Sequence, residues 1–164
     1  MKRKELPFTI NCEGYFLDRK GNILAKEDSN IIIFPGGGIN KGEKVIDAMI
    51  RETKEETGAI VKNLKELGVV KVIWNPTWAK TEKQKLRYKS FQGDEMHFFL
   101  GDIDSFEKLE VKEEDFWDGN KLMNVNKVIK KIEEKAPFDD GIIKYREAQL
   151  NFLKMIIKIR NKIN

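Results

Sequence analysis

The chain has 164 residues, of which 40% are hydrophobic and 35% charged, and its 31 basic and 27 acidic residues leave a net charge of +4. A chain of this length can bury a core without a structural metal, and a single cysteine, Cys12, excludes an internal disulfide and a thiolate zinc site. No stretch approaches the roughly 18 consecutive apolar residues of a membrane span, and polar residues interrupt the N-terminal segment before a signal-peptide core can form. We therefore expect one cytoplasmic domain over residues 1–164 without a membrane partner, and the small net charge argues against a nucleic-acid partner.

A β-hairpin is predicted near the start of the chain. Residues 8–17 are rich in β-branched and aromatic side chains, which is typical of a strand. The polar segment 18–22 contains a glycine that can adopt φ > 0, so it predicts a turn. Residues 23–25 would then form the return strand.

The next elements are a buried strand, a glycine-rich turn and a helix. Residues 31–34 form a short, continuously apolar run, which predicts a buried strand. The three glycines at 36–38 follow and allow a turn with φ > 0. Helical spacing of apolar residues then predicts a helix from about Lys41 to Thr57, with Asn40 as its N-cap and Gly58 as its terminating residue.

The middle of the chain is predicted to contain two strands and a long loop between them. Residues 60–74 have strand character, with a break near Gly68. Residues 75–93 are polar and basic without clear periodicity, as in a lid or binding loop. Residues 95–100 alternate in polarity, so one face of this strand is expected to be core, formed by Met96, Phe98 and Leu100.

Two amphipathic helices are predicted at the C-terminal end, over about 124–135 and 142–160. Apolar residues cover a large part of the circumference of the second helix, so it is expected to pack on more than one side. Packing within its own domain and a homodimer contact both remain open.

Three carboxylates crowd one side of the predicted helix 41–57. A helix advances about 100° per residue, which places Glu52, Glu55 and Glu56 close together. Like charges at this spacing destabilise a helix by roughly 0.2–0.5 kcal/mol per pair. A divalent cation would remove the repulsion, and Mg²⁺ and Mn²⁺ prefer such oxygen ligands. Arg51 lies four residues before Glu55 and can orient a carboxylate through a charge-assisted hydrogen bond.

The same segment resembles the Nudix box, G-x5-E-x7-R-E-U-x-E-E-x-G-U, in which U is a bulky aliphatic residue. Thr53 and Ala59 stand at the two U positions and are smaller or more polar than the pattern asks. Residues 34–38 and 113–123 are also similar to the segments that precede and follow the box in this family. The fixed positions of the box are all matched, by Gly37, Glu43, Arg51, Glu52, Glu55, Glu56 and Gly58.

The resemblance implies a fold, a reaction and a role for each matched residue. The fold would be an α/β/α sandwich with a mixed central sheet, and the reaction would be Mg²⁺- or Mn²⁺-dependent hydrolysis of a nucleoside diphosphate linked to another group. Glu52 would be a candidate base for the attacking water, Arg51 would position the carboxylates, and Glu43 would support the loop and helix. The metal ligands would be Glu52, Glu55, Glu56 and the backbone carbonyl of Gly37.

The general base has other candidates, because the family places it differently in different members. Glu95 lies on the predicted strand 95–100, where an exposed structural role is the alternative. Glu113 lies in an acidic run that could simply be solvated. His97 shares a strand face with Glu95 and is a candidate substrate contact or an ordinary half-buried residue.

Candidate substrate-binding residues flank the box. Gly36 and Gly38 would let the backbone approach a phosphate. Trp74 and Trp78 offer a surface on which a base could stack, and Arg87 with neighbouring lysines could meet phosphates. The alternative is a solvated loop with one packed tryptophan. The sequence does not choose between nucleoside triphosphates, dinucleoside polyphosphates and nucleotide sugars.

Two rival functions remain beside that of a pyrophosphohydrolase. A non-catalytic module that senses a nucleotide would be favoured by degenerate box carboxylates, and none is degenerate here. An RNA 5′-end pyrophosphohydrolase would be favoured by the basic segment 80–89, although the small overall charge argues against it.

Overall fold

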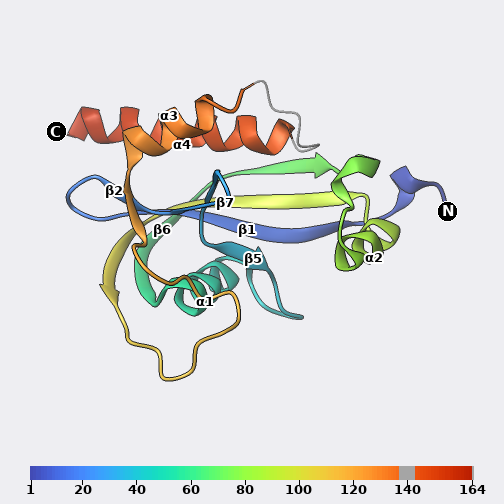
Figure 1. Ribbon diagram of the computed structural model, residues 1–164, viewed down its shortest axis with the longest axis horizontal. Helices are drawn as coiled ribbons and strands as arrows, with labels where there is room; N and C mark the ends of the chain where they lie inside the picture. The colour runs from blue at the N-terminus through green and yellow to red at the C-terminus, as the bar shows by residue number, and fades with distance from the viewer. Residues whose placement is uncertain (137–142, 164) are drawn as a thin grey trace.

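A computed structural model describes residues 1–136 and 143–163. It shows a central sheet with helix α1 (Val45–Thr57) on one face and helices α3 (Val125–Glu133) and α4 (Ile143–Ile163) on the other (Figure 1). The sheet order is β6-β7-β1-β2-β8, and β5 pairs with β1 beside this path. This arrangement confirms the expected α/β/α sandwich. The sheet strands are β1 (Phe8–Leu17), β2 (Asn22–Leu24), β5 (Gly36–Gly38), β6 (Ala59–Ile73), β7 (Gly93–Phe106) and β8 (Leu122–Asn124).

The sheet is mixed, as expected, because β1 and β7 run parallel while its other pairs are antiparallel. The parallel pairing extends from Phe8 opposite Gly93 to Leu17 opposite Asp102. The β6–β7 register shifts between Glu66 and Gly68, where the sequence predicted a break. The hairpin of β1 and β2 is also present, with a turn at 18–22 between its ends.

Side chains alternate between two cores across the sheet. Tyr15 and Phe98 face α3 (Val125–Glu133) and α4 (Ile143–Ile163), whereas Phe16 packs against α1 (Val45–Thr57). Successive residues of β1 therefore belong to opposite layers. The predicted core face of β7 is confirmed, since Met96 and Phe98 are buried and Leu100 packs against the same cluster.

The strand predicted at 31–34 is present, but it is only partly buried and lies outside the central sheet. Residues Ile31–Ile33 form β4, which pairs only with β3 (Lys26–Asp28) in a separate two-stranded sheet. Ile31 is 46% exposed, while Ile32 and Phe34 are buried. One face of this small sheet packs on the core, so the apolar run is not buried throughout.

Helix α1 begins at Val45, four residues later than predicted. Asn40 does not cap it; instead the backbone N–H of Asn40 donates to Glu43 Oε1 at 3.0 Å in the preceding turn. Gly58 ends the helix as predicted, with φ 79° and its N–H bonded to the Lys54 carbonyl at 2.8 Å. The buried residues of α1 include polar ones, namely Thr53, Glu56 and Thr57.

The long loop predicted at 75–93 is also wrong. This segment contains a short 3₁₀ helix, η2 (Pro76–Trp78), and helix α2 (Glu82–Ser90). Thr81 and Gln84 form a capping box: the Gln84 N–H donates to Thr81 Oγ1 at 3.1 Å, and the Thr81 N–H donates to Gln84 Oε1 at 3.0 Å. The helix lacks apolar periodicity because none of its residues is buried, so only its capping box indicated it.

The C-terminal helix packs on α3 and the sheet. Ala148, Leu153 and Ile156 are buried there, whereas Met155 and Ile159 are exposed. Residue 142, where the sequence placed the helix start, lies outside the described residues. A homodimer contact through the exposed face stays a prediction. Within the described parts of the chain, no helix has both the length and the apolar content needed to cross a membrane.

Candidate active site

Arg51 is the centre of the polar network on α1. Its Nε donates to Glu43 Oε2 at 2.9 Å and its Nη2 to Glu43 Oε1 at 2.9 Å, a two-point pairing that fixes the plane of the guanidinium. Nη2 also lies 3.2 Å from the Gly38 carbonyl oxygen. The hydrogen bonds that Glu43 accepts from Arg51 and from the Asn40 N–H lower the pKa of Glu43. Arg51 therefore ties α1 to the turn before it and to β5.

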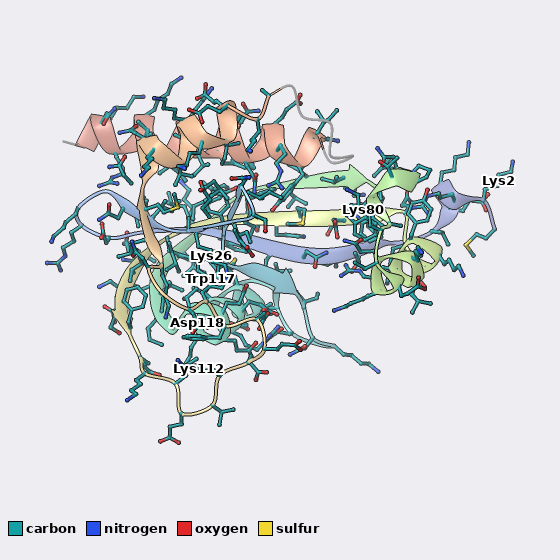
Figure 2. All side chains as sticks on the ribbon, in the orientation of Figure 1. Lys2, Lys26, Lys80, Lys112, Trp117 and Asp118 are labelled. Carbon is teal, nitrogen blue, oxygen red and sulfur yellow. The ribbon has the colours of Figure 1, made fainter. Side chains whose placement is uncertain are left out.

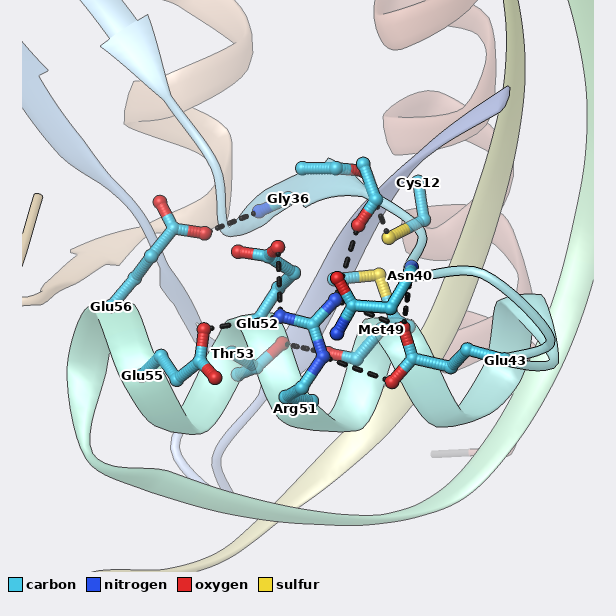
Figure 3. A network of polar contacts seen from close by, with 12 residues as sticks. Cys12, Gly36, Asn40, Glu43, Met49, Arg51, Glu52, Thr53, Glu55 and Glu56 are labelled. Carbon is cyan, nitrogen blue, oxygen red and sulfur yellow. Dashed lines mark hydrogen bonds and ion pairs between the residues drawn. The ribbon is translucent and has the colours of Figure 1, made fainter. Parts of the chain in front are cut away.

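The same guanidinium holds two further carboxylates (Figure 3). Nη1 donates to Glu52 Oε1 at 3.0 Å and to Glu55 Oε2 at 3.1 Å. Burial nevertheless raises the pKa of Glu52, with the charges of Glu55 and Asp115 adding to the effect. One cation thus only partly compensates this group of acids.

Glu56 lies deepest in the network and is 7% exposed. Its Oε1 accepts a hydrogen bond from the Gly36 N–H at 2.9 Å. Burial, together with the negative charges of Glu52 and Asp115, raises the pKa of Glu56 to about 8, although the hydrogen bond from Gly36 acts against the rise. A buried carboxyl without its own cation is costly to ionise.

The donor types in this network fit Mg²⁺ or Mn²⁺, which prefer several carboxylate oxygens. The uncompensated charge around Glu56 is also what a bound cation would relieve. As placed, however, Glu52 and Glu55 turn toward Arg51, and Glu56 turns toward the Gly36 N–H. Across residues 1–136 and 143–163 no three acidic, histidine or cysteine side chains converge as a metal site. Metal binding would require these side chains to rotate.

The three glycines form strand β5 rather than the predicted turn, and none of them has a positive φ. Close approach explains Gly36 and Gly37 instead. A Cβ on Gly36 would lie 2.3 Å from the Cys12 carbonyl oxygen, and a Cβ on Gly37 would lie 2.6 Å from the Glu52 carboxyl carbon. The N-terminus of helix α1 at Val45 is separated from the glycines by the turn.

A pocket of about 340 Å³ adjoins the carboxylates. Its lining includes Gly36, Gly37 and Glu56. Trp78 and Arg87 also line it. Met96 and Tyr145 contribute apolar and aromatic surface. The predicted substrate residues Trp78 and Arg87 thus reach the same space as the Nudix-box residues, although they come from a different part of the chain.

Asp94 is a pocket residue that the sequence did not single out. It accepts hydrogen bonds from Trp74 Nε1 at 2.8 Å and from Asn11 Nδ2 at 2.5 Å, and Arg87 Nη2 lies 3.8 Å away. Burial raises the pKa of Asp94, although these donors act against the rise. The parallel β1–β7 register brings Asn11 near Asp94, a contact that no local motif indicates.

The two tryptophans stack on each other, with ring centroids 3.8 Å apart and planes within 7°. Trp74 is buried beneath Trp78. Trp74 therefore does not offer a free face to a base, and the predicted stacking surface is reduced to Trp78, which lines the pocket.

The other candidate residues lie outside this pocket. His97 bonds Glu66 through Nδ1 and Glu95 through Nε2, each at 2.9 Å, on the strands β6 and β7. Glu113 is exposed in the segment after β7. The acid of that segment whose charge acts on Glu52 and Glu56 is Asp115, which lies two residues before Trp117; the Trp117 N–H donates to the Glu56 carbonyl at 2.7 Å.

Comparisons with known proteins agree with this fold and network. The NUDIX domain family matches residues 14–145, so the chain belongs to the NUDIX family. A NUDIX hydrolase from Nitrosomonas europaea superposes with a TM-score of 0.54 over 76% of this chain and 77% of that chain, at 18% identity. That likeness supports the fold.

Two kinds of relative share sequence with the chain. "Putative 8-oxo-dGTP diphosphatase YtkD" of Bacillus subtilis is 45% identical over 51 residues, which are 31% of this chain and 32% of the relative. An RNA pyrophosphohydrolase of Xanthomonas axonopodis is 31% identical over 135 residues, covering 66% of this chain and 63% of the relative. The chain thus spans less than two thirds of the length of each of these relatives.

Proposed function

We propose that this protein hydrolyses a phosphoric anhydride bond in a nucleoside triphosphate or related nucleotide, with Mg²⁺ or Mn²⁺ as cofactor. The observation that carries the proposal is the position of Glu56: it belongs to the carboxylate network of α1 and also lines the pocket that contains Trp78 and Arg87. A site for phosphates and a concave site for the rest of a nucleotide are therefore adjacent.

The printed names of the two relatives support the same class of reaction. One name refers to a deoxynucleoside triphosphate and the other to RNA, and both describe cleavage at a polyphosphate. We include in the proposal a single domain over residues 1–164 and a cytoplasmic setting; the single cysteine is consistent with that setting.

Each residue of the network would have a separate task. Glu52, Glu55, Glu56 and the Gly37 carbonyl would hold a divalent metal, which when bound polarises the anhydride and lowers the pKa of bound water. Arg51 bonds Glu52 and Glu55 through Nη1 and would keep them near the site, from which they would rotate to hold the metal. The raised pKa of Glu52 suits a group that accepts a proton from water on a carboxylate oxygen.

The pocket would receive the nucleobase. Trp78 offers an aromatic face, Asp94 offers acceptor oxygens, and Arg87 offers hydrogen-bond donors. Polar groups at the wall of a largely apolar pocket fix the orientation of a ligand. This would leave the phosphates directed toward Gly37 and the carboxylates.

A panel of ribonucleotides and deoxyribonucleotides with Mg²⁺ or Mn²⁺ tests the proposal. Wild-type protein should release phosphate or pyrophosphate, and Glu56→Gln should lose at least about 100-fold in kcat because charge stabilisation by the metal site is weakened. Asp47→Asn, an exposed change on the same helix, serves as the matched control. Tight nucleotide binding without product over the whole panel would instead favour a sensing module.

A further inference from the structure

A second cavity, of about 370 Å³, lies at the edge of β1. Strand β5 pairs only with Asn11–Glu13 of β1, so the first residues of β1, from Phe8 to Ile10, extend past it. Two residues, Asn11 and Arg87, line both this cavity and the pocket beside Glu56. The two spaces therefore adjoin each other. We call the second one the edge groove; it is lined by Phe8, Thr9, Ile10, Asn11, Gly38, Ile39, Arg87 and Phe91.

The edge groove has an aromatic and apolar lining that is only half-buried. Phe8, Ile10, Ile39 and Phe91 keep part of their surface accessible, and Arg87 supplies a cation beside them. Flat, partly exposed aromatic side chains beside an arginine are a suitable surface for a nucleobase, which stacks by its face whatever its identity.

The end of the molecule beside the groove is strongly basic. Residues 2–5 and 80–91 carry eight basic and two acidic side chains, a net charge of +6, which exceeds the +4 of the whole chain and leaves −2 for the rest. Arg3 joins the two segments, since its guanidinium lies 3.2 Å from the Tyr88 ring centroid and bonds the Tyr88 carbonyl. Figure 2 shows Lys2 and Lys80 at this end.

We propose that the edge groove binds the second nucleotide of a 5′-triphosphorylated RNA whose first base occupies the pocket beside Glu56, and that the basic end follows the RNA backbone. This inference rests on the proposed function. The charge segregation answers the objection that the net charge of the chain is too small for RNA, because a local basic surface sets the electrostatic attraction. A mononucleotide would leave the edge groove empty.

The first test compares a 5′-triphosphorylated dinucleotide with the matching nucleoside triphosphate. We expect a higher kcat/KM for the dinucleotide, and Phe91→Ala should reduce that value about tenfold, as expected when a stacking contact is lost, while hydrolysis of the mononucleotide is unchanged. Leu86→Ala, on the exposed side of α2 and outside the groove lining, is the control. Equal kcat/KM values for the two substrates, or an equal effect of Phe91→Ala on both, would overturn the proposal. So would a dinucleoside polyphosphate that outperforms the RNA end.

The second test measures binding by fluorescence anisotropy of a labelled, 5′-triphosphorylated oligonucleotide in EDTA. Lys83→Glu with Lys89→Glu should weaken binding and reduce the slope of log K against log salt by about 1.4, since each single-strand phosphate contact contributes about 0.7. Lys130→Glu with Lys158→Glu makes the same charge change on the opposite, α3–α4 side of the sheet (Figure 1) and should leave the slope unchanged.

The two proposals fail in different ways. If the protein binds the oligonucleotide through Phe91 and the α2 lysines but cleaves no nucleotide, the proposed edge groove stands and the proposed hydrolase activity is wrong. If the protein hydrolyses mononucleotides but binds RNA equally well with and without Phe91, only the proposal for the edge groove is wrong. A thermal unfolding midpoint near the wild-type value shows that each variant is folded.

Discussion

Replacing Gly37 by alanine should lower the catalytic rate while leaving the stability of the fold nearly unchanged. The added Cβ would lie 2.6 Å from the Glu52 carboxyl carbon and 2.8 Å from each of its oxygens, whereas ordinary contact begins near 3.4 Å. The carboxylate must therefore move by about 1 Å, and a displacement of that size at a reacting group can cost about 100-fold in rate. We expect kcat/KM for the preferred nucleotide to fall by about that factor, equivalent to roughly 2.7 kcal/mol.

The stability of the Gly37→Ala protein should change little. The obstacle is the end of a flexible side chain, so we expect the free energy of unfolding to change by less than about 1 kcal/mol. Gly36→Ala offers the contrast, because its Cβ would meet the Cys12 carbonyl oxygen at 2.3 Å. Backbone cannot rotate away, and a loss of about 1–3 kcal/mol is expected from overpacking.

Steady-state kinetics and urea unfolding, measured on the same preparations, show whether the loss of activity occurs without a loss of stability. Gly68→Ala is the control, because its Cβ would approach the Phe152 ring at 3.0 Å, away from the carboxylates; it should leave kcat/KM within about twofold. Full activity in a folded Gly37→Ala protein would show that the position of Glu52 does not matter for turnover.

Three further changes have expected outcomes. In EDTA, the unfolding free energy of wild type relative to Glu56→Gln should fall by roughly 2–4 kcal/mol between pH 5 and pH 9. The folded-state pKa of Glu56 is raised to about 8, chiefly by burial. The stability that protonated Glu56 contributes is therefore complete below the pKa of the unfolded state and is lost as pH rises through 8. A flat difference would contradict the assignment. Arg51→Lys should lower kcat about 10- to 100-fold in a folded protein, because a lysine cannot bond Glu43 at two points; unchanged kcat would refute it. Tyr145→Phe should cost about 1–3 kcal/mol in urea unfolding, since Tyr145 donates to the buried Glu13, and a change within error would show that the bond contributes little.

Local spacing predicted the part of the site that lies within one helix. Arg51 and Glu55 are one turn apart, so their contact follows from helical periodicity alone. The resemblance to the family implied only that Glu43 supports the loop and helix; that Arg51 is its partner is seen in the structure. The wall of the pocket could not be predicted in this way, because the contact of Asn11 with Asp94 depends on the register of two strands that are distant in sequence.

The misassigned features have separate physical causes. The glycines at 36–38 were interpreted through their freedom to adopt positive φ and to let the backbone approach a ligand. None of them has a positive φ, and the absent Cβ lets Gly36 and Gly37 lie close to Cys12 and Glu52. Helix α2 was missed because it buries no residue and so shows no apolar periodicity. Asp115 could not be distinguished from Glu113 by composition, since both belong to one acidic run, and only the path of the chain past Glu56 separates them.

The placement of the tryptophans makes intrinsic tryptophan fluorescence a probe of the candidate site. The chain has three: Trp74 and Trp78 form the stack at the pocket, and the backbone of Trp117 bonds Glu56. Indole emission responds to nearby charge and stacking, so tryptophan emission, excited at wavelengths that tyrosine does not absorb, reports on the surroundings of the candidate site. Occupation of the pocket can thus be followed in solution without a dye, and unfolding of a remote segment should leave the signal unchanged.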